Sequence, residues 1–150
     1  MERGAVFLPP EAPRRQLNVV GEKIRVLAEA TQTGSYEVFE QFGPRGAGPP
    51  PHTHAWDEAY FMLEGEMDVQ IGDRMVVLAP GGFVHLPGGT PHCFRYRSAT
   101  GRFLSVTSRG GAAGFFGAVA AALPDGTPDV PTIVDVAARH GVSLAAPPRG

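Results

Sequence analysis

Glycine and proline divide this sequence into short runs of strand-forming residues. They number 20 and 15 among the 150 residues, and they fall between the runs instead of gathering in one tract. Within the runs, apolar and polar side chains tend to alternate, as they do over 67–71. This spacing is typical of an all-β sandwich or barrel, in which turns follow one another closely.

The runs predict about nine or ten short strands. We expect strands at 23–28, 36–42, 59–63, 67–71, 75–78, 83–86, 92–96 and 102–107. Residues 64–66 are expected to form a hairpin turn, with further turns at 72–74 and 87–91. Residues 115–123 and 132–139 favour helices, the second capped by Gly141. One or two C-terminal helices would then pack outside the β-core.

These elements suggest one domain with two extensions. We expect an N-terminal arm at 1–19, a β-barrel at 20–108 and a C-terminal helical extension at 109–150, with frayed ends over 145–150. A chain of 150 residues buries roughly 70% of its unfolded surface, so it needs no disulfide to fold.

Charge and cysteine content exclude several classes of partner. Lys and Arg total 13 against 15 Asp and Glu, so the net charge of -2 attracts neither nucleic acid nor an anionic membrane. Cys93 is the only cysteine, which fits a reducing compartment. The N-terminus lacks a signal-peptide pattern, and no window approaches the ~20 apolar residues of a membrane span. We expect a soluble, cytoplasmic protein.

Three histidines and one glutamate have the pattern of a metal site. His52 and His54 are two residues apart, Glu58 follows, and His92 comes much later. Imidazole nitrogens and a carboxylate oxygen suit Zn, Fe, Mn, Co, Ni or Cu(II), and the absence of thiolate argues against Cu(I) and iron–sulfur. The sequence therefore predicts one divalent transition metal as the cofactor.

The spacing around His52 imposes conditions on the local backbone. On a strand, residues two apart share a face, so His52 and His54 can reach one ion only from an extended segment. Three prolines at 49–51 hold the approach extended. Glu58 lies about 13 Å further along an unbroken strand, so it can join the site only if residues 55–57 bend.

The other histidines have different roles. His92 must be carried back by the sheet, and the turn at 87–89 would aim its strand. A lone His-x-His pair more often consists of ordinary surface or core residues than of metal ligands. The glutamate and the third histidine make metal ligands the favoured interpretation here. His85 is either a pocket residue or an exposed one, and His140 is expected in solvent at a helix end.

Several aromatic or flexible side chains share strand parity with the expected ligands or lie in the expected bend. They would line a substrate pocket or simply form barrel core, and for Met62 and Phe94 barrel core is the favoured interpretation. This set comprises Trp56, Tyr60, Met62, Phe94 and Tyr96. Glu58 is the candidate catalytic residue, because a carboxylate can also accept a substrate proton.

Two motifs resemble those of the cupin superfamily. The first is Gly46-x5-His52-x-His54-x3-Glu58-x6-Gly65, and the second is Gly81-x5-Pro87-x-Gly89-x2-His92. The second motif often ends in Asn, where this chain has Tyr96. The resemblance implies a double-stranded β-helix (jelly-roll) barrel with His52, His54, Glu58 and His92 as metal ligands. It also implies a homodimer, and the chain looks most like small bacterial single-domain cupins described as quercetin dioxygenase-like.

A second resemblance, to a DNA-binding motif, is incomplete. Residues 132–143 look like the start of a lac-repressor-type helix-turn-helix, but the Pro-containing segment at 144–150 cannot supply a recognition helix. We therefore expect no DNA binding.

The residues and the resemblance together suggest a function. A shell of three histidines and one carboxylate leaves metal positions open, as catalytic sites do. The leading hypothesis is a metal-dependent oxygenase acting on a small phenolic or enolic compound. The alternatives are a non-redox isomerase or lyase acting on a sugar or keto acid, and a cupin that binds a small molecule without turnover. Neither the metal nor the substrate follows from the sequence.

Overall fold

A computed structural model describes residues 4–144, and these form eleven strands and three helices. The strands are β1 (Gln16–Val19), β2 (Glu22–Ala28), β3 (Tyr36–Pro44), β4 (His52–Thr53), β5 (Glu58–Glu64), β6 (Met67–Ile71), β7 (Arg74–Leu78), β8 (Phe83–Leu86), β9 (His92–Tyr96), β10 (Thr100–Ser108) and β11 (Ser143–Leu144). The helices are α1 (Ala30–Thr33), α2 (Ala112–Ala122) and α3 (Val130–Arg139). The expected fraying at 145–150 lies outside the described residues.

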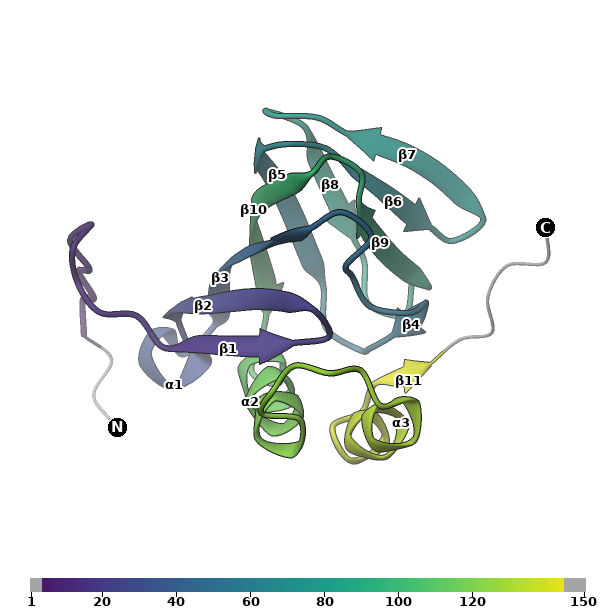
Figure 1. The fold of residues 1–150 in the computed structure, drawn as a ribbon. Coiled ribbons are helices and arrows are strands. Elements are labelled where there is room, and N and C mark those ends of the chain that lie inside the picture. The colour runs from purple at the N-terminus through teal and green to yellow at the C-terminus, as the bar shows by residue number, and fades with distance from the viewer. Residues whose placement is uncertain (1–3, 145–150) are drawn as a thin grey trace.

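The strands form two antiparallel sheets that face each other (Figure 1). One has the order β1-β2-β3-β10-β5-β8, and the other has the order β11-β4-β9-β6-β7. Alternate residues of the central strands are buried, as β9 shows with its pattern of buried and half-buried positions. The expected all-β jelly-roll fold is confirmed. The six-stranded sheet begins at Gln16, inside the segment expected to be an arm.

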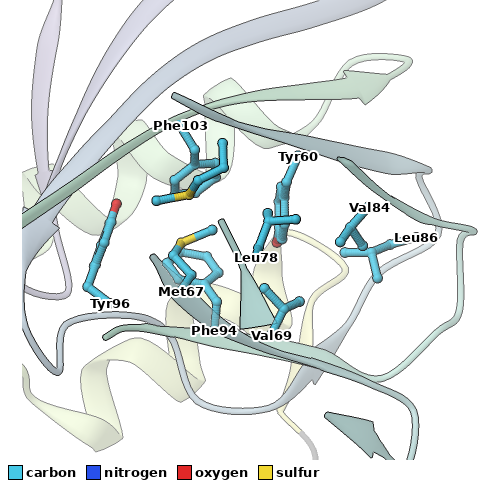
Figure 2. Packing of buried hydrophobic residues seen from close by; sticks show 10 residues of the cluster. Tyr60, Met67, Val69, Leu78, Val84, Leu86, Phe94, Tyr96 and Phe103 are labelled. Atoms are coloured by element: carbon cyan, nitrogen blue, oxygen red, sulfur yellow. The ribbon is translucent and has the colours of Figure 1, made fainter. Parts of the chain in front are cut away.

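The main hydrophobic core fills the space between the two sheets. Figure 2 shows its side chains converging from both sheets, with Tyr96 at the edge of the cluster. The core consists of Tyr60, Met62, Met67, Val69, Leu78, Val84, Leu86, Phe94, Tyr96 and Phe103. Aromatic rings pack edge to face within it, with the centroids of Tyr60 and Phe103 5.1 Å apart.

A second core joins the six-stranded sheet to the C-terminal helices. It contains Leu17, Val19, Ile24, Val26 and Phe39 from the strands, and Ala112, Ala113, Val119 and Val136 from α2 and α3. Both expected helices are present and begin two to three residues earlier than the sequence pattern indicated. The Asp129 side chain accepts a hydrogen bond from the amide of Thr132, which explains the earlier start of α3.

Strand β3 turns a charged residue inward. Glu37 is 3% exposed, and its carboxylate accepts hydrogen bonds from the amides of Ala30 at 3.1 Å and Ala113 at 3.0 Å. These amides lie in the first turns of α1 and α2, where backbone donors lack helical partners. Glu37 therefore fixes the start of the C-terminal helical segment to the sheet.

The expected hairpin at 64–66 is wrong. Strand β5 belongs to the six-stranded sheet and β6 to the five-stranded one, so this turn crosses between the sheets. Gly65 passes so close to the turn before β10 that a Cβ there would lie 2.4 Å from the carbonyl oxygen of Thr100. The next turn does form a hairpin, in which Ile71 pairs with Arg74. Both turns contain glycine, so local sequence could not distinguish them.

The bend expected at 55–57 and the turn expected at 87–91 pack against each other. Residues 55–57 do bend, and the turn before β9 lies on them. The amide of Gly89 donates to the carbonyl of His54 at 2.8 Å, and that of Gly88 donates to the Asp57 carboxylate at 2.8 Å. A Cβ on Gly88 would lie 2.1 Å from the carbonyl oxygen of Ala55. This contact places the start of β9 beside the start of β5.

Among residues 4–144, no helix is long and apolar enough to cross a membrane. Location in the cytoplasm stays a prediction.

Gly88→Ala should destabilise the protein, because the new methyl group must push the backbone of Ala55 away. We expect the free energy of unfolding in urea to fall by about 2 kcal/mol or more. Gly114→Ala is the control, since a Cβ at this helical position meets nothing within 4 Å. Alanine there should leave stability unchanged or slightly raised. Equal stability of Gly88→Ala and wild type would contradict this account of the turn.

Candidate metal centre

The four expected ligand residues come together at one end of the barrel. His52 lies in β4, His54 directly follows it, and Glu58 and His92 are the first residues of β5 and β9. His52 and His92 are cross-strand partners, which brings the two sequence motifs side by side. The bend at 55–57 returns the chain so that Glu58 joins them.

The histidine cluster (His52, His54 and His92) is compact. One ring nitrogen from each residue lies within 4.8 Å of the others. The Oε2 atom of Glu58 is 2.9 Å from Nε2 of His54 and 3.3 Å from Nε2 of His92. Glu58 and His92 are 6% and 1% exposed, so bulk water does not screen these groups.

Each ring of the histidine cluster uses its Nδ1 atom to bond a backbone carbonyl two residues away. His52 bonds the carbonyl of Pro50 at 2.9 Å, His54 that of Trp56 at 2.9 Å, and His92 that of Thr90 at 2.7 Å. A carbonyl oxygen only accepts, so every Nδ1 carries the proton. In the neutral rings, Nε2 is therefore an unprotonated lone pair, which is the form that binds metals.

These lone pairs face one another and a carboxylate. Two acceptors cannot approach to 2.9 Å without a proton or a cation between them. Nε2 of His92 is buried and, when it carries no proton, has no hydrogen-bond partner among residues 4–144. A divalent cation would satisfy all of these donor atoms at once, so the residues present fit a metal ion.

The pKa values agree with this charge arrangement. Burial alone would raise the pKa of Glu58, but the hydrogen bonds and charge that His54 and His92 supply when their Nε2 atoms are protonated outweigh it and hold the pKa at about 2. Burial, with the charge of His92 as a smaller cause, lowers the pKa of His52 to about 4. At neutral pH the site thus offers an ionised carboxylate and a neutral His52.

Aromatic residues surround the ligand set. The indole of Trp56 stacks on the His54 ring, with 4.2 Å between centroids and 9° between planes. Burial, with the charge of Glu58 and a hydrogen bond to it, raises the pKa of Tyr60 well above its ordinary value. The phenol of Tyr60 therefore stays protonated beside Glu58.

A largely apolar cavity opens onto the histidine cluster. Its wall includes three of the expected pocket residues, Trp56, Tyr60 and Phe94. Met62 is fully buried in the main core and does not line the cavity. Tyr96 lies behind the wall, where its hydroxyl donates a 2.8 Å hydrogen bond to Glu22, which does line the cavity.

Two groups of cavity residues are missing from the sequence-based set. Glu22 on β2 and Gln41 on β3 share inward parity with Ile24 and Phe39, so strand alternation could have found them. The roof of the cavity comes from the C-terminal segment, and no local signal indicates that it reaches the barrel. The roof residues are Phe115, Phe116, Ile133, Val142 and Leu144. Leu144 on β11 pairs with His52 itself.

The remaining histidines lie outside the site. His85 is exposed on β8, and the half-buried His140 lies near Phe115, with 6.1 Å between ring centroids.

Comparisons with known proteins agree with this fold. A family model described as "Cupin domain" matches residues 38–107. A quercetin 2,3-dioxygenase of Bacillus subtilis (strain 168) is 28% identical over 96 residues, which is 63% of this chain. The chain spans only 28% of the length of that relative.

Two solved structures share the fold. An RmlC-like cupin from Shewanella frigidimarina has a TM-score of 0.63 and 19% identity, over 72% of this chain and 94% of its own. The KdgF protein from a Halomonas species has a TM-score of 0.60 and 20% identity, over 69% of this chain and 94% of its own.

His92→Ala should remove metal, because the cross-strand partner of His52 is lost. We expect metal affinity to fall at least about 100-fold in a chelator competition assay. His85→Ala is the matched control, since this exposed histidine lies away from the cluster, and its affinity should equal that of wild type. Equal metal content of the two variants by elemental analysis would contradict the site.

Metal affinity should also fall as the pH decreases. Burial opposes protonation of His92, but the hydrogen bond and charge of Glu58 outweigh it and raise its pKa above the ordinary 6.5. A proton on Nε2 competes with the ion, so the loss should begin above pH 6.5. The same competition assay in mildly alkaline and mildly acidic buffers measures this change, and a constant affinity would count against Nε2 as the ligand atom.

Proposed function

Because this chain contains a cupin domain and belongs to the cupin superfamily, we propose that its barrel end is a metal-dependent active site. His52, His54, Glu58 and His92 hold one divalent transition metal, which is Fe, Mn, Ni, Cu, Co or Zn. The protein is an oxygenase that acts on a small phenolic or enolic compound.

One observation carries this proposal. Three imidazole lone pairs and an ionised carboxylate converge at the wall of an apolar cavity with several aromatic side chains. When bound, a redox-active ion of this set supplies electron transfer to oxygen and polarises the oxygen atoms of the substrate. A site of this kind suits a flat molecule that is apolar except for a few oxygen atoms.

The chain's own residues position and activate the substrate. Trp56, Tyr60 and Phe94 offer aromatic faces, and the roof residues add apolar side chains to the cavity wall. Glu58 is ionised, so its carboxylate can accept the proton of a phenol or enol as the general base. The phenol of Tyr60 beside it stays protonated, because its pKa is raised well above the ordinary value.

The similarity to the Bacillus protein supports the proposed oxygenase activity. That relative is named as a dioxygenase of quercetin, and its similarity to this chain covers 96 residues. The similarity concerns less than a third of the relative's length, so the oxygenase activity of this chain is an inference from its site.

Oxygen uptake tests the oxygenase. The protein is loaded separately with each of the six metals. At least one redox-active form should consume oxygen with at least one phenol or 1,3-diketone, and the Zn form should be inactive. Glu58→Gln should lower kcat/KM about 100-fold or more, because the general base is lost. Metal content is measured in parallel, since Glu58 is also a ligand. Glu66→Gln is the control, because Glu66 is exposed away from the site.

Three outcomes separate the hypotheses. No uptake with any metal over the whole panel overturns the oxygenase. Turnover with Zn under nitrogen indicates an isomerase or lyase. Binding without turnover, unaffected by Glu58→Gln, indicates a cupin that only binds its ligand.

We also propose that the protein is a homodimer. Phe61 and Phe83 are cross-strand partners on the outer face of the six-stranded sheet, and they are 43% and 63% exposed. Val106, 40% exposed, lies diagonal to Phe61 on the neighbouring strand β10. Exposed apolar side chains that adjoin across three strands favour burial against a second copy.

Phe83→Lys should convert the dimer to a monomer, because a charged side chain in the contact face would have to be buried. Size-exclusion chromatography with light scattering measures the mass. Met75→Lys is the control, since Met75 is 61% exposed on β7 of the other sheet. A monomeric wild type would contradict this proposal.

A further inference from the structure

Two polar side chains of the cavity wall belong neither to the ligand set nor to the hydrophobic core. Glu22 and Gln41 line the cavity and are only 4% and 2% exposed. Burial of such groups is unfavourable unless they have hydrogen-bond partners. Their presence in a largely apolar wall therefore requires an explanation.

Strand pairing places the two residues next to each other. Ile24 on β2 is the cross-strand partner of Gln41 on β3. Glu22 is two residues before Ile24 and so points to the same face, diagonal to Gln41. Diagonal neighbours on a sheet are about 7–8 Å apart, close enough for both side chains to reach one small group between them.

Tyr96 fixes the orientation of Glu22. Its hydroxyl donates to Oε1 of Glu22 at 2.8 Å, and no other hydrogen bond to this carboxyl occurs among residues 4–144. The Tyr96 ring lies against Gly43 and Gly101, where an added Cβ would come within 2.8 Å and 2.6 Å of it. Two glycines on adjacent strands thus make room for the ring that holds Glu22. The second oxygen, Oε2, is left for the cavity.

Gln41 also has unused hydrogen-bonding capacity. Its Oε1 atom is buried and has no hydrogen-bond partner within the described part of the chain. A glutamine amide offers both an acceptor and two donors, so it can adapt to a carbonyl or to a hydroxyl. A buried amide without a partner is expected in the free protein if a bound ligand supplies the missing hydrogen bond.

We propose that Glu22 and Gln41 form a hydrogen-bonding subsite that recognises a neutral carbonyl or hydroxyl oxygen of the substrate. This subsite is distinct from the histidine cluster and rests on the proposed function, because the same cavity takes the substrate. The substrate then carries two oxygen functions, one directed to the metal centre and one to the subsite.

The charge state of Glu22 favours a neutral oxygen. Burial is the main cause that raises the pKa of Glu22 to about 8, and the charge of Glu58 adds to it. At neutral pH the carboxyl group is therefore protonated, and its proton can be donated to a carbonyl oxygen. A carboxylate on the substrate would contact no cationic side chain at this wall, since neither Lys nor Arg is among the residues of 4–144 that line the cavity.

Three probes with the same catechol group test this subsite. Catechol has no remote polar group, 3,4-dihydroxybenzaldehyde adds a neutral carbonyl, and 3,4-dihydroxybenzoate adds a carboxylate. Titration calorimetry on Zn-loaded protein under nitrogen measures their affinities without any turnover. The aldehyde should bind about tenfold more tightly than catechol. The benzoate should bind no better than catechol.

Variants assign the preference to the two residues. Glu22→Met and Gln41→Met keep the length of the side chain and should each remove most of the aldehyde's advantage. Tyr96→Phe should weaken it, and Glu22→Gln should retain part of it, because an amide still donates. Lys23→Met is the matched control, since the exposed Lys23 is adjacent to Glu22 on β2 but points away from the cavity. Catechol affinity should be unchanged in all of them, which shows that each variant is folded.

The outcomes separate this inference from the proposed function. An aldehyde preference that depends on Glu22 and Gln41 supports the subsite even if no oxygen uptake is found. Equal affinities for the three probes, no binding of the aldehyde, or a preference that survives both methionine variants overturns the subsite. None of these results depends on oxygenase activity.

Discussion

Three hydrogen bonds from imidazole to backbone determine the chemistry at the end of this barrel. Each histidine donates Nδ1–H to a carbonyl two residues away, and this commits the opposite nitrogen to act as an acceptor. The carbonyls come from the segment before β4, the bend at 55–57 and the turn before β9. Those segments must therefore keep their shape, and the packing of Gly88 on Ala55 provides it. The geometry of these loops therefore determines which nitrogen of each imidazole ring carries the proton.

Much of the fold and the ligand set could be predicted from the sequence, because the signals are local. Turn residues mark the strand ends, and the two motifs place His52 and His92 in positions that only an extended segment and a tight turn can satisfy. The turn at 64–66 was assigned wrongly, because whether a glycine turn joins neighbours or crosses between sheets depends on distant contacts such as that with Thr100. The roof of the cavity is also non-local, since nothing near Phe115 or Leu144 in sequence indicates the barrel.

The inward polar residues were missed for a different reason. An alternating pattern is normally interpreted by placing its apolar members inside, yet β3 turns Glu37 and Gln41 inward and leaves Tyr36 exposed. Glu37 accepts hydrogen bonds from helix amides, whereas the side-chain carbonyl oxygen of Gln41 has no partner among the residues that the structure describes. Positions where local rules fail in this way often carry function, because they reduce stability unless a ligand compensates. Tyr96 has two roles. Its ring packs at the edge of the barrel core, and its hydroxyl donates a hydrogen bond to Glu22.

The parts of the cavity are encoded far apart in the chain. All four candidate ligands lie between residues 52 and 92, whereas the roof residues lie between 115 and 144. A lineage can therefore exchange or remodel the roof by mutation, or by replacement of one terminal segment, without altering the ligand set. Natural selection can thus change the shape of the cavity while the candidate ligand set is inherited intact. In this architecture, the cavity wall and the candidate ligand set are separate units of evolutionary change.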